Sequence, residues 1–296
     1  MQTISLSDGV AEVEIVPSLG AGLASYDLIS QGGREPLLRR CRDLSRATPF
    51  DLANNLLVPW SNRISGGGFA FGGRFHPLQP NLVGEPMPIH GNGFSSAWEV
   101  VEASAVNAFL TLNSAGPGPF KFLAAVRYSL DQGALRVALK VTNHGQEALP
   151  FGLGLHPWFP RTPGTTLQAR AAFVTLEDSL HLPAGQVSVA SREDWNFSTH
   201  RCLPHHWINN DFSPWDGQAE IIWSDRGLRL SIEAEGALSA YILYSPASDA
   251  DFFCFEPVTH LVDAHNRAGG PKANGLAILD HRDDLAIACR FAPTRL

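Results

Sequence analysis

Two apolar segments of this chain each contain a side chain that can donate or accept a proton. In each segment this side chain comes directly before a proline. The segments are residues 151–159, FGLGLHPWF, and residues 251–260, DFFCFEPVTH. Side chains of a strand alternate between two faces, so the first segment presents His156 opposite its apolar face, and the second presents Glu256 on the same face as Cys254. Imidazole and carboxylate groups are the usual agents of general acid–base catalysis. The two segments therefore supply a candidate acid–base pair.

The first segment predicts a groove as well as a histidine. Its odd-numbered positions are apolar and predict a core face, whereas Gly152 and Gly154 leave the other face nearly bare. Pro157 is expected to end the strand directly after His156. This arrangement favours a polar ligand the size of a sugar lying on a glycine floor. The alternative is a bend in a barrel with a solvent-facing histidine.

Two loops offer further polar groups. Asn62 and Arg63 follow the tryptophan of VPWSNRI, where a guanidinium fork is able to bind two hydroxyls or a carboxylate. His90 ends the proline-stiffened segment PMPIHGNGF. Taken singly, Glu256 and Arg63 are explained by surface ion pairs, and His90 by an ordinary surface or core histidine. They indicate a site only if these segments converge in space.

Other chemistries lack their usual motifs. The chain has no GxSxG nucleophile elbow, no GxxxxGK[ST] loop and no GxGxxG fingerprint. It has no HExxH or HxH pair, and the cluster of His200, His205 and His206 lies in a stretch expected to be a solvated loop. We therefore expect neither a metal ion nor an organic cofactor.

Composition narrows the class of protein. The 296 residues are 44% hydrophobic and only 17% charged, which predicts a large buried core. The net charge is −7 and no basic run occurs, which disfavours nucleic acid and anionic membranes as partners. The four cysteines are scattered, and no signal peptide or membrane-spanning run is evident. We expect a soluble cytoplasmic protein with reduced thiols.

Almost every segment alternates with a period of two, which predicts strands. Examples are residues 9–16, the pair around Gly72–Gly73, and the hairpin in which residues 126–130 oppose residues 135–141. Residues 31–50 and 79–93 are predicted to be connections, the former with one helical turn, and residues 181–217 to be irregular. Many strands without crossover helices predict an all-β fold, a large antiparallel sandwich, forming a single domain over residues 1–296.

A resemblance then emerges from five segments in order: PWSNRI, GGxF, IHGNGF, GLGLHPWF and FEPVTHLVDAHN. Together they resemble the aldose 1-epimerase (galactose mutarotase) family over about residues 54–266. The resemblance implies a galactose mutarotase-like β-supersandwich whose concave face binds a free aldose. It implies that His156 is the general acid and Glu256 the general base, with Arg63 and His90 contacting substrate and Asn62 beside them.

The sequence departs from the family pattern in one loop. The family usually carries a sugar-binding aspartate three residues before a phenylalanine, whereas here Asn209 precedes Phe212 at that spacing. Asn209 can still bind a hydroxyl, and Asp211 or Asp216 is the alternative. The usual sugar preference therefore does not carry over.

The implied activity is interconversion of the α and β anomers of galactose, glucose or a related aldose, an isomerase reaction. The ordinary pKa values of these side chains in water put glutamate in its basic form and histidine near half-protonated at neutral pH, and a neighbouring carboxylate favours the imidazolium. The expected partner is a monosaccharide, and the chain is expected to be a monomer or homodimer. The alternatives are a mutarotase for a hexose 6-phosphate, recruiting Arg74 or Arg40, and a non-catalytic carbohydrate-binding protein.

Overall fold

The computed structural model describes residues 1–247 and 249–296, and most of its regular structure is β-strand. The strands up to residue 151 are β1 (Ile4–Ser7), β2 (Ala11–Val16), β3 (Gly22–Ser30), β4 (Gly33–Pro36), β5 (Asn54–Leu57), β6 (Gly68–Phe71), β7 (Arg74–Pro77), β8 (Glu99–Ala103), β9 (Asn107–Ser114), β10 (Phe122–Asp131), β11 (Ala134–Asn143) and β12 (Leu149–Phe151). The later strands are β13 (Gly154–Pro160), β14 (Thr165–Glu177), β15 (Pro183–Ser188), β16 (Arg201–Cys202), β17 (Ile208–Trp223), β18 (Leu228–Gly236), β19 (Ala240–Ser245), β20 (Phe252–Val258), β21 (Ala277–Leu279) and β22 (Asp284–Arg295). The helical pieces of the described chain are short: η1 (Pro49–Asp51), η2 (Val189–Ser191), η3 (Glu193–Trp195), η4 (Ser224–Arg226) and α1 (Gly270–Ala273).

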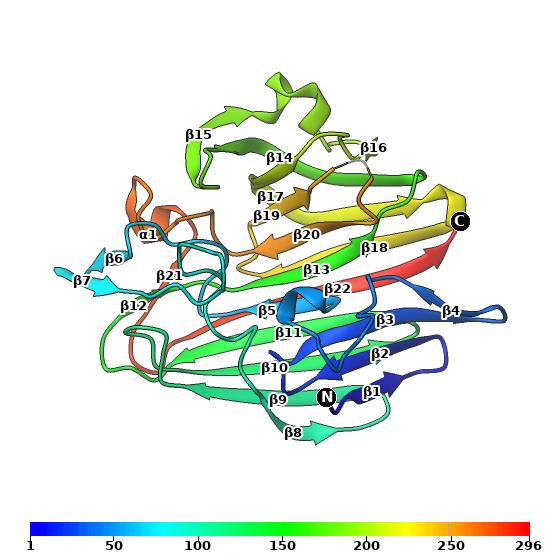
Figure 1. Cartoon of the computed structure of the whole chain (residues 1–296), viewed down its shortest axis with the longest axis horizontal. Coiled ribbons are helices and arrows are strands. Elements are labelled where there is room, and N and C mark those ends of the chain that lie inside the picture. Colours follow the sequence, from blue (N-terminus) through cyan, green and yellow to red (C-terminus); the bar gives the residue numbers. More distant parts are fainter. Residues whose placement is uncertain (248) are drawn as a thin grey trace.

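Antiparallel pairing joins most of these strands into one sheet that folds into two layers (Figure 1). One layer runs β8, β9, β10, β11, β22, β18, and the other runs β1, β2, β3, β5, β13, β20, β19. The long strand β17 joins them, because residues 208–212 pair with β19 and residues 218–223 pair with β18. The all-β antiparallel sandwich expected from the sequence is confirmed.

The core lies between the two layers. The hydroxyl of Tyr26 on β3 donates to the carbonyl of Gly133 at 2.6 Å, in the turn between β10 and β11. Phe159 of β13 packs against Phe291 of β22 with ring centroids 6.5 Å apart. Burial of one continuous apolar cluster of this kind is the main stabilising contribution in such a sandwich.

The period-two prediction holds where it matters for the site. Leu155 and Phe159 of β13 and Phe253 and Phe255 of β20 are fully buried in the core. The alternate residues of both strands therefore face away from the core, on the other side of the layer. The hairpin register is also as predicted, with Val126 paired to Leu139.

Three sequence-based expectations are wrong in detail. Pro157 does not end the strand: it lies opposite Asn54 of β5, and β13 continues to Pro160, with Trp158 paired to Cys254 of β20. The space above Gly152 and Gly154 is no open floor either, because it is filled by the side chains of His260 and Val258. The glycines permit a close approach by the protein's own chain.

The third wrong expectation concerns residues 181–217, which contain β15, β16 and the first half of β17. The asparagines, the aspartates and the single proline of INNDFSPWDG suggest a loop, yet residues 208–212 form a full ladder with β19 and residues 212–223 pair with β14. Tertiary pairing on both edges overrides the weak local propensity.

No helix in the described residues has the length and apolar character to cross a bilayer.

Candidate active site

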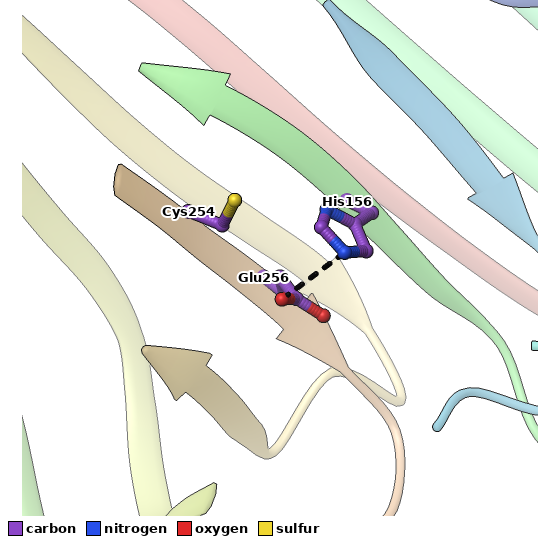
Figure 2. Close-up of side chains that lie close together, drawn as sticks. All are labelled: His156, Cys254 and Glu256. Atoms are coloured by element: carbon purple, nitrogen blue, oxygen red, sulfur yellow. Dashed lines mark ion pairs between the residues drawn. The ribbon is translucent and has the colours of Figure 1, made fainter. Parts of the chain in front are cut away.

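His156 and Glu256 meet on neighbouring strands. In the β13–β20 ladder Gly154 pairs with Val258 and Trp158 with Cys254, which places His156 opposite Glu256. Their side chains leave the same face, and His156 Nε2 lies 3.4 Å from Glu256 Oε1 (Figure 2). The structure thus brings together two groups separated by 100 residues, as the sequence analysis expected.

Burial sets the protonation of this pair. It raises the pKa of Glu256 to about 8 and lowers the pKa of His156 to about 3, since each charged form loses its hydration. Between these values the pair holds one proton, and burial favours carboxylic acid with neutral imidazole. This differs from the expected ionised glutamate and protonated histidine, because that expectation used the pKa values of groups in water.

The pair forms the floor of a pocket of about 230 Å³. The pocket walls are mostly aromatic and polar, from Phe50, Asn62, Arg63, Leu82, Glu85, Ile89, His90, Trp158, His181, Trp207, Asn209 and Tyr244. The His156 ring stacks on Trp158 with an interplanar angle of 15°, and Arg39 covers the Trp158 ring 4.0 Å from its centroid. A larger hollow of about 450 Å³ beside Arg42 and Arg46 contains neither member of the pair.

Asn62 and His90 hold each other in the wall. The backbone N–H of Asn62 donates to His90 Nδ1 at 3.0 Å, and the backbone N–H of His90 donates to the Asn62 carbonyl at 3.1 Å. Both residues have φ of +59°, a conformation that non-glycine residues seldom adopt outside constrained sites. Since Nδ1 accepts, the proton of neutral His90 sits on Nε2. Burial keeps the pKa of His90 well below its usual value, so this residue is a neutral donor in the wall.

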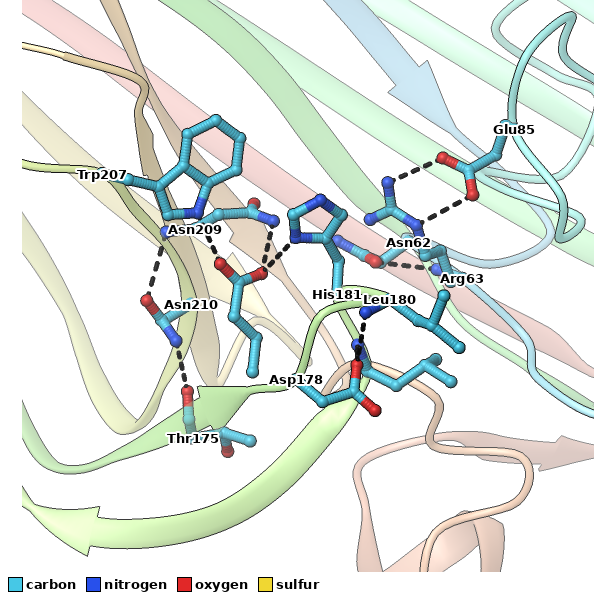
Figure 3. A network of polar contacts seen from close by, with 12 residues as sticks. Asn62, Arg63, Glu85, Thr175, Asp178, Leu180, His181, Trp207, Asn209 and Asn210 are labelled. Carbon is cyan, nitrogen blue, oxygen red and sulfur yellow. Dashed lines mark hydrogen bonds and ion pairs between the residues drawn. The ribbon is translucent and has the colours of Figure 1, made fainter.

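Arg63 lines the pocket, but two of the three nitrogens of its guanidinium group are bonded to another side chain of the protein. Nε and Nη2 form a two-point ion pair with Glu85, at 3.1 and 2.7 Å (Figure 3). The expected two-hydroxyl fork is therefore already occupied, and only Nη1 has no hydrogen bond within the described part of the chain. The pair with Glu85 fixes the guanidinium and compensates its charge in the wall.

The opposite wall is centred on Glu177, which sequence reasoning missed. Its carboxylate accepts from His181 Nδ1 at 2.8 Å, Trp207 Nε1 at 2.5 Å and Asn209 Nδ2 at 2.9 Å. These three donors all line the pocket (Figure 3). Glu177 ends β14, and only the pairing of β14 with β15 and β17 brings the four residues together. No sequence motif carries that information.

The structure places Asn209 in the pocket but not Asp211. Asp211 is 1% exposed, and its Oδ2 accepts from the Val262 N–H at 3.0 Å and lies 3.5 Å from Arg267. It lies beneath the segment after β20, which covers that part of β17. Asp216 is exposed and also lies outside the pocket lining. Of the alternatives for the family's aspartate, Asn209 alone reaches the pocket.

Comparison with known proteins agrees with this geometry. The family model described as aldose 1-epimerase matches residues 2–275. The chain belongs to the aldose 1-epimerase family. It is 34% identical over 274 residues to the uncharacterized protein YphB of Escherichia coli K12, covering 88% of this chain and 93% of that one.

Solved structures show the same family fold. A putative aldose 1-epimerase from Escherichia coli K12 superposes with a TM-score of 0.92 at 29% identity, covering 100% of this chain and 99% of that one. An aldose epimerase homologue from C. elegans gives 0.83 at 18% identity, with coverage of 100% and 99%. The mutarotase-like supersandwich expected from the resemblance is confirmed.

Proposed function

We propose that this member of the aldose 1-epimerase family is an active mutarotase that interconverts the anomers of a free, uncharged aldose. The observation that carries the proposal is the His156–Glu256 pair, 3.4 Å apart on the floor of a sugar-sized pocket. A pair with one proton always contains one donor and one acceptor. Ring opening at C1 requires both at once.

The proton balance closes without a further reagent. Glu256, in its carboxylate form, takes the proton of the C1 hydroxyl while the protonated imidazole of His156 gives one to the ring oxygen, and the C1–ring oxygen bond breaks. Rotation about the C1–C2 bond turns the other face of the aldehyde toward the ring hydroxyl. Closure reverses both transfers, so the pair ends with the same single proton. The ion-pair form that starts this sequence is reached by moving that proton from Glu256 to His156.

The walls suit a neutral sugar. Trp158, Trp207 and Tyr244 offer aromatic surface to the C–H face of a pyranose. His90 Nε2–H, Arg63 Nη1 and Asn209 are the polar groups that can meet hydroxyls. Together these groups bind and orient a monosaccharide without adding net positive charge, since the pKa of His90 is lowered and Arg63 pairs with Glu85.

The hexose 6-phosphate alternative finds no support in the pocket. Arg40 pairs with Asp27 at 2.8 Å and Arg74 pairs with Glu147, and neither lines the pocket. Both candidate phosphate ligands are therefore committed elsewhere. A dianionic substrate would enter beside the Glu85 carboxylate, and the guanidinium among the described pocket residues, that of Arg63, is already paired with it, so we propose an uncharged aldose.

Polarimetry tests the proposal. Freshly dissolved α-glucose and α-galactose should relax faster in the presence of the protein, and Glu256→Gln and His156→Asn should each lose at least about 10²-fold in kcat, the usual contribution of one positioned proton transfer. Circular dichroism should show the same fold for both variants. Sugar binding without any acceleration by the wild-type protein would instead identify a carbohydrate-binding protein.

A further inference from the structure

A third side chain of ligand type lies against the His156–Glu256 pair. Cys254 precedes Glu256 by two residues on β20, so both side chains leave the same face of the strand. The Cys254 sulfur, an imidazole nitrogen of His156 and a carboxylate oxygen of Glu256 all lie within 4.8 Å of one another (Figure 2). All three residues are buried.

These positions approach those of a zinc site. Bonds of about 2.0–2.3 Å to tetrahedral zinc place nitrogen and oxygen ligands about 3.4 Å apart. His156 Nε2 and Glu256 Oε1 are already 3.4 Å apart. We propose that His156, Cys254 and Glu256 form a zinc-binding site on the floor of the pocket, where a Zn²⁺ ion and the sugar exclude one another. The inference does not depend on the mutarotase activity.

Unused ligand capacity supports the site. Glu256 Oε2 is buried and has no hydrogen-bond partner among the described residues. A buried polar atom without a partner is unfavourable, and a metal ion bound by both oxygens of the carboxylate would provide that partner for Oε2. His156 and Glu256 line the pocket, so a water molecule there would serve as the fourth ligand.

The ligand set and its charge favour a soft divalent ion. Thiolate and imidazole together select zinc over magnesium or calcium, which prefer oxygen ligands. On binding, the Cys254 thiol and the His156–Glu256 pair would each release one proton to solvent, and the resulting thiolate and carboxylate carry two negative charges. These balance the two positive charges of Zn²⁺, so the complex adds no net charge to a buried site.

Metal binding by the whole chain tests the site directly. After removal of bound metal with a chelator, titration calorimetry with ZnCl₂ should show one site per chain. Cys254→Ser should weaken zinc binding by at least about tenfold, since even loss of an outer-shell partner has that effect. The matched controls are Cys289→Ser, a buried thiol on β22, and Cys202→Ser, an exposed one. Both should bind zinc like the wild type.

A spectroscopic measurement on the wild-type protein tests the site even if the Cys254→Ser variant misfolds. Co²⁺ added in place of zinc should produce thiolate-to-cobalt charge-transfer absorption that one equivalent saturates and ZnCl₂ abolishes. Absence of that band, or equal zinc affinity in Cys254→Ser and the wild type, would overturn the site. Loss of zinc binding in Cys202→Ser would show that the ion binds at the surface, at Cys202, and would also overturn the proposed site. None of these outcomes depends on whether the protein accelerates mutarotation.

Discussion

At the scale of single residues, the chemistry depends on how many protons His156 and Glu256 hold. Alternation along two strands predicts from sequence that both side chains leave the core face, and their family motifs predict that they meet. The raised pKa of Glu256 and lowered pKa of His156 could not be predicted, because they arise from burial in the folded chain, to which distant segments such as that of Phe50 contribute. The sequence does not predict Cys254 as a metal ligand either, because the fold, and no spacing motif, brings His156 next to it.

The shifted pKa values predict an alkaline limit to activity. The pair keeps its proton up to the pKa of Glu256, about 8, and a second proton adds only below the pKa of His156, about 3. We therefore expect kcat/KM to stay flat from about pH 5 to 7 and to fall with unit slope above about pH 8. The polarimetric rate, corrected at each pH for the spontaneous reaction in the same buffer, measures this profile. A fall centred near pH 6.5, the ordinary histidine value, would contradict it.

The same burial predicts a stability change in Glu256→Gln. The folded protein keeps the Glu256 proton up to about pH 8, whereas the unfolded chain loses it near pH 4.5, so the wild type loses stability as pH rises through that window. Glutamine does not titrate, and the contribution of His156, which is lost as pH falls from 6.5 toward 3, is common to both proteins. As the pH rises from 5 to 8, the free energy of unfolding of the variant, taken relative to that of the wild type, should therefore increase by a few kcal/mol. Urea denaturation at both pH values measures the difference, and parallel pH dependence would refute the assignment.

At the scale of elements, the pocket joins segments whose proximity only the topology creates. The end of β14 supplies Glu177, the following loop supplies His181, and the start of β17 supplies Asn209. The sequence analysis assigned residues 181–217 to irregular structure, because polar and proline residues conceal the pairing of β17. Spacing pointed to Asn209, which the structure places in the pocket lining, but it gave no sign of Glu177, the partner that orients Asn209.

We expect Glu177 to position this wall without touching substrate. Glu177→Gln replaces an acceptor of three hydrogen bonds by an amide that cannot accept all three, so His181, Trp207 and Asn209 lose their fixed orientation. Loss of about 1–3 kcal/mol of binding raises KM by roughly 5–150-fold, with a smaller change in kcat. Steady-state polarimetry separates the two constants.

Glu220 provides the matched control for that variant. It accepts from His200 at 2.7 Å and lies near Arg229 at 3.2 Å, outside the pocket lining. Glu220→Gln should leave both KM and kcat within about twofold of the wild type, as expected for an exposed ion pair. If the two variants behave alike, or if Glu177→Gln changes kcat alone, Glu177 has a different role.

At the scale of the molecule, the site lies on one outer face of a two-layer sandwich. The shape of the pocket therefore depends on how the two layers are held together. β13 and β20 are fixed from below by core side chains that contact the other layer, as Phe159 contacts Phe291. Composition and period two predicted the sandwich. They did not predict the order of strands across it, because that order is set by pairings between strands far apart in the chain.

Two buried tyrosine hydroxyls link the layers, which leads to a prediction about stability alone. The Tyr26 hydroxyl donates to the Gly133 carbonyl at 2.6 Å and accepts from the Leu135 N–H at 3.2 Å, whereas the Tyr128 hydroxyl makes one bond, to the Ala21 carbonyl at 2.7 Å. Tyr26→Phe leaves two buried backbone groups unsatisfied and should lower the free energy of unfolding by about 1–3 kcal/mol, more than Tyr128→Phe does. Because neither hydroxyl reaches the pocket, kcat and KM should not change. Equal stability of Tyr26→Phe and the wild type in urea denaturation, or lost activity at unchanged stability, would show that this link does not hold the layers together.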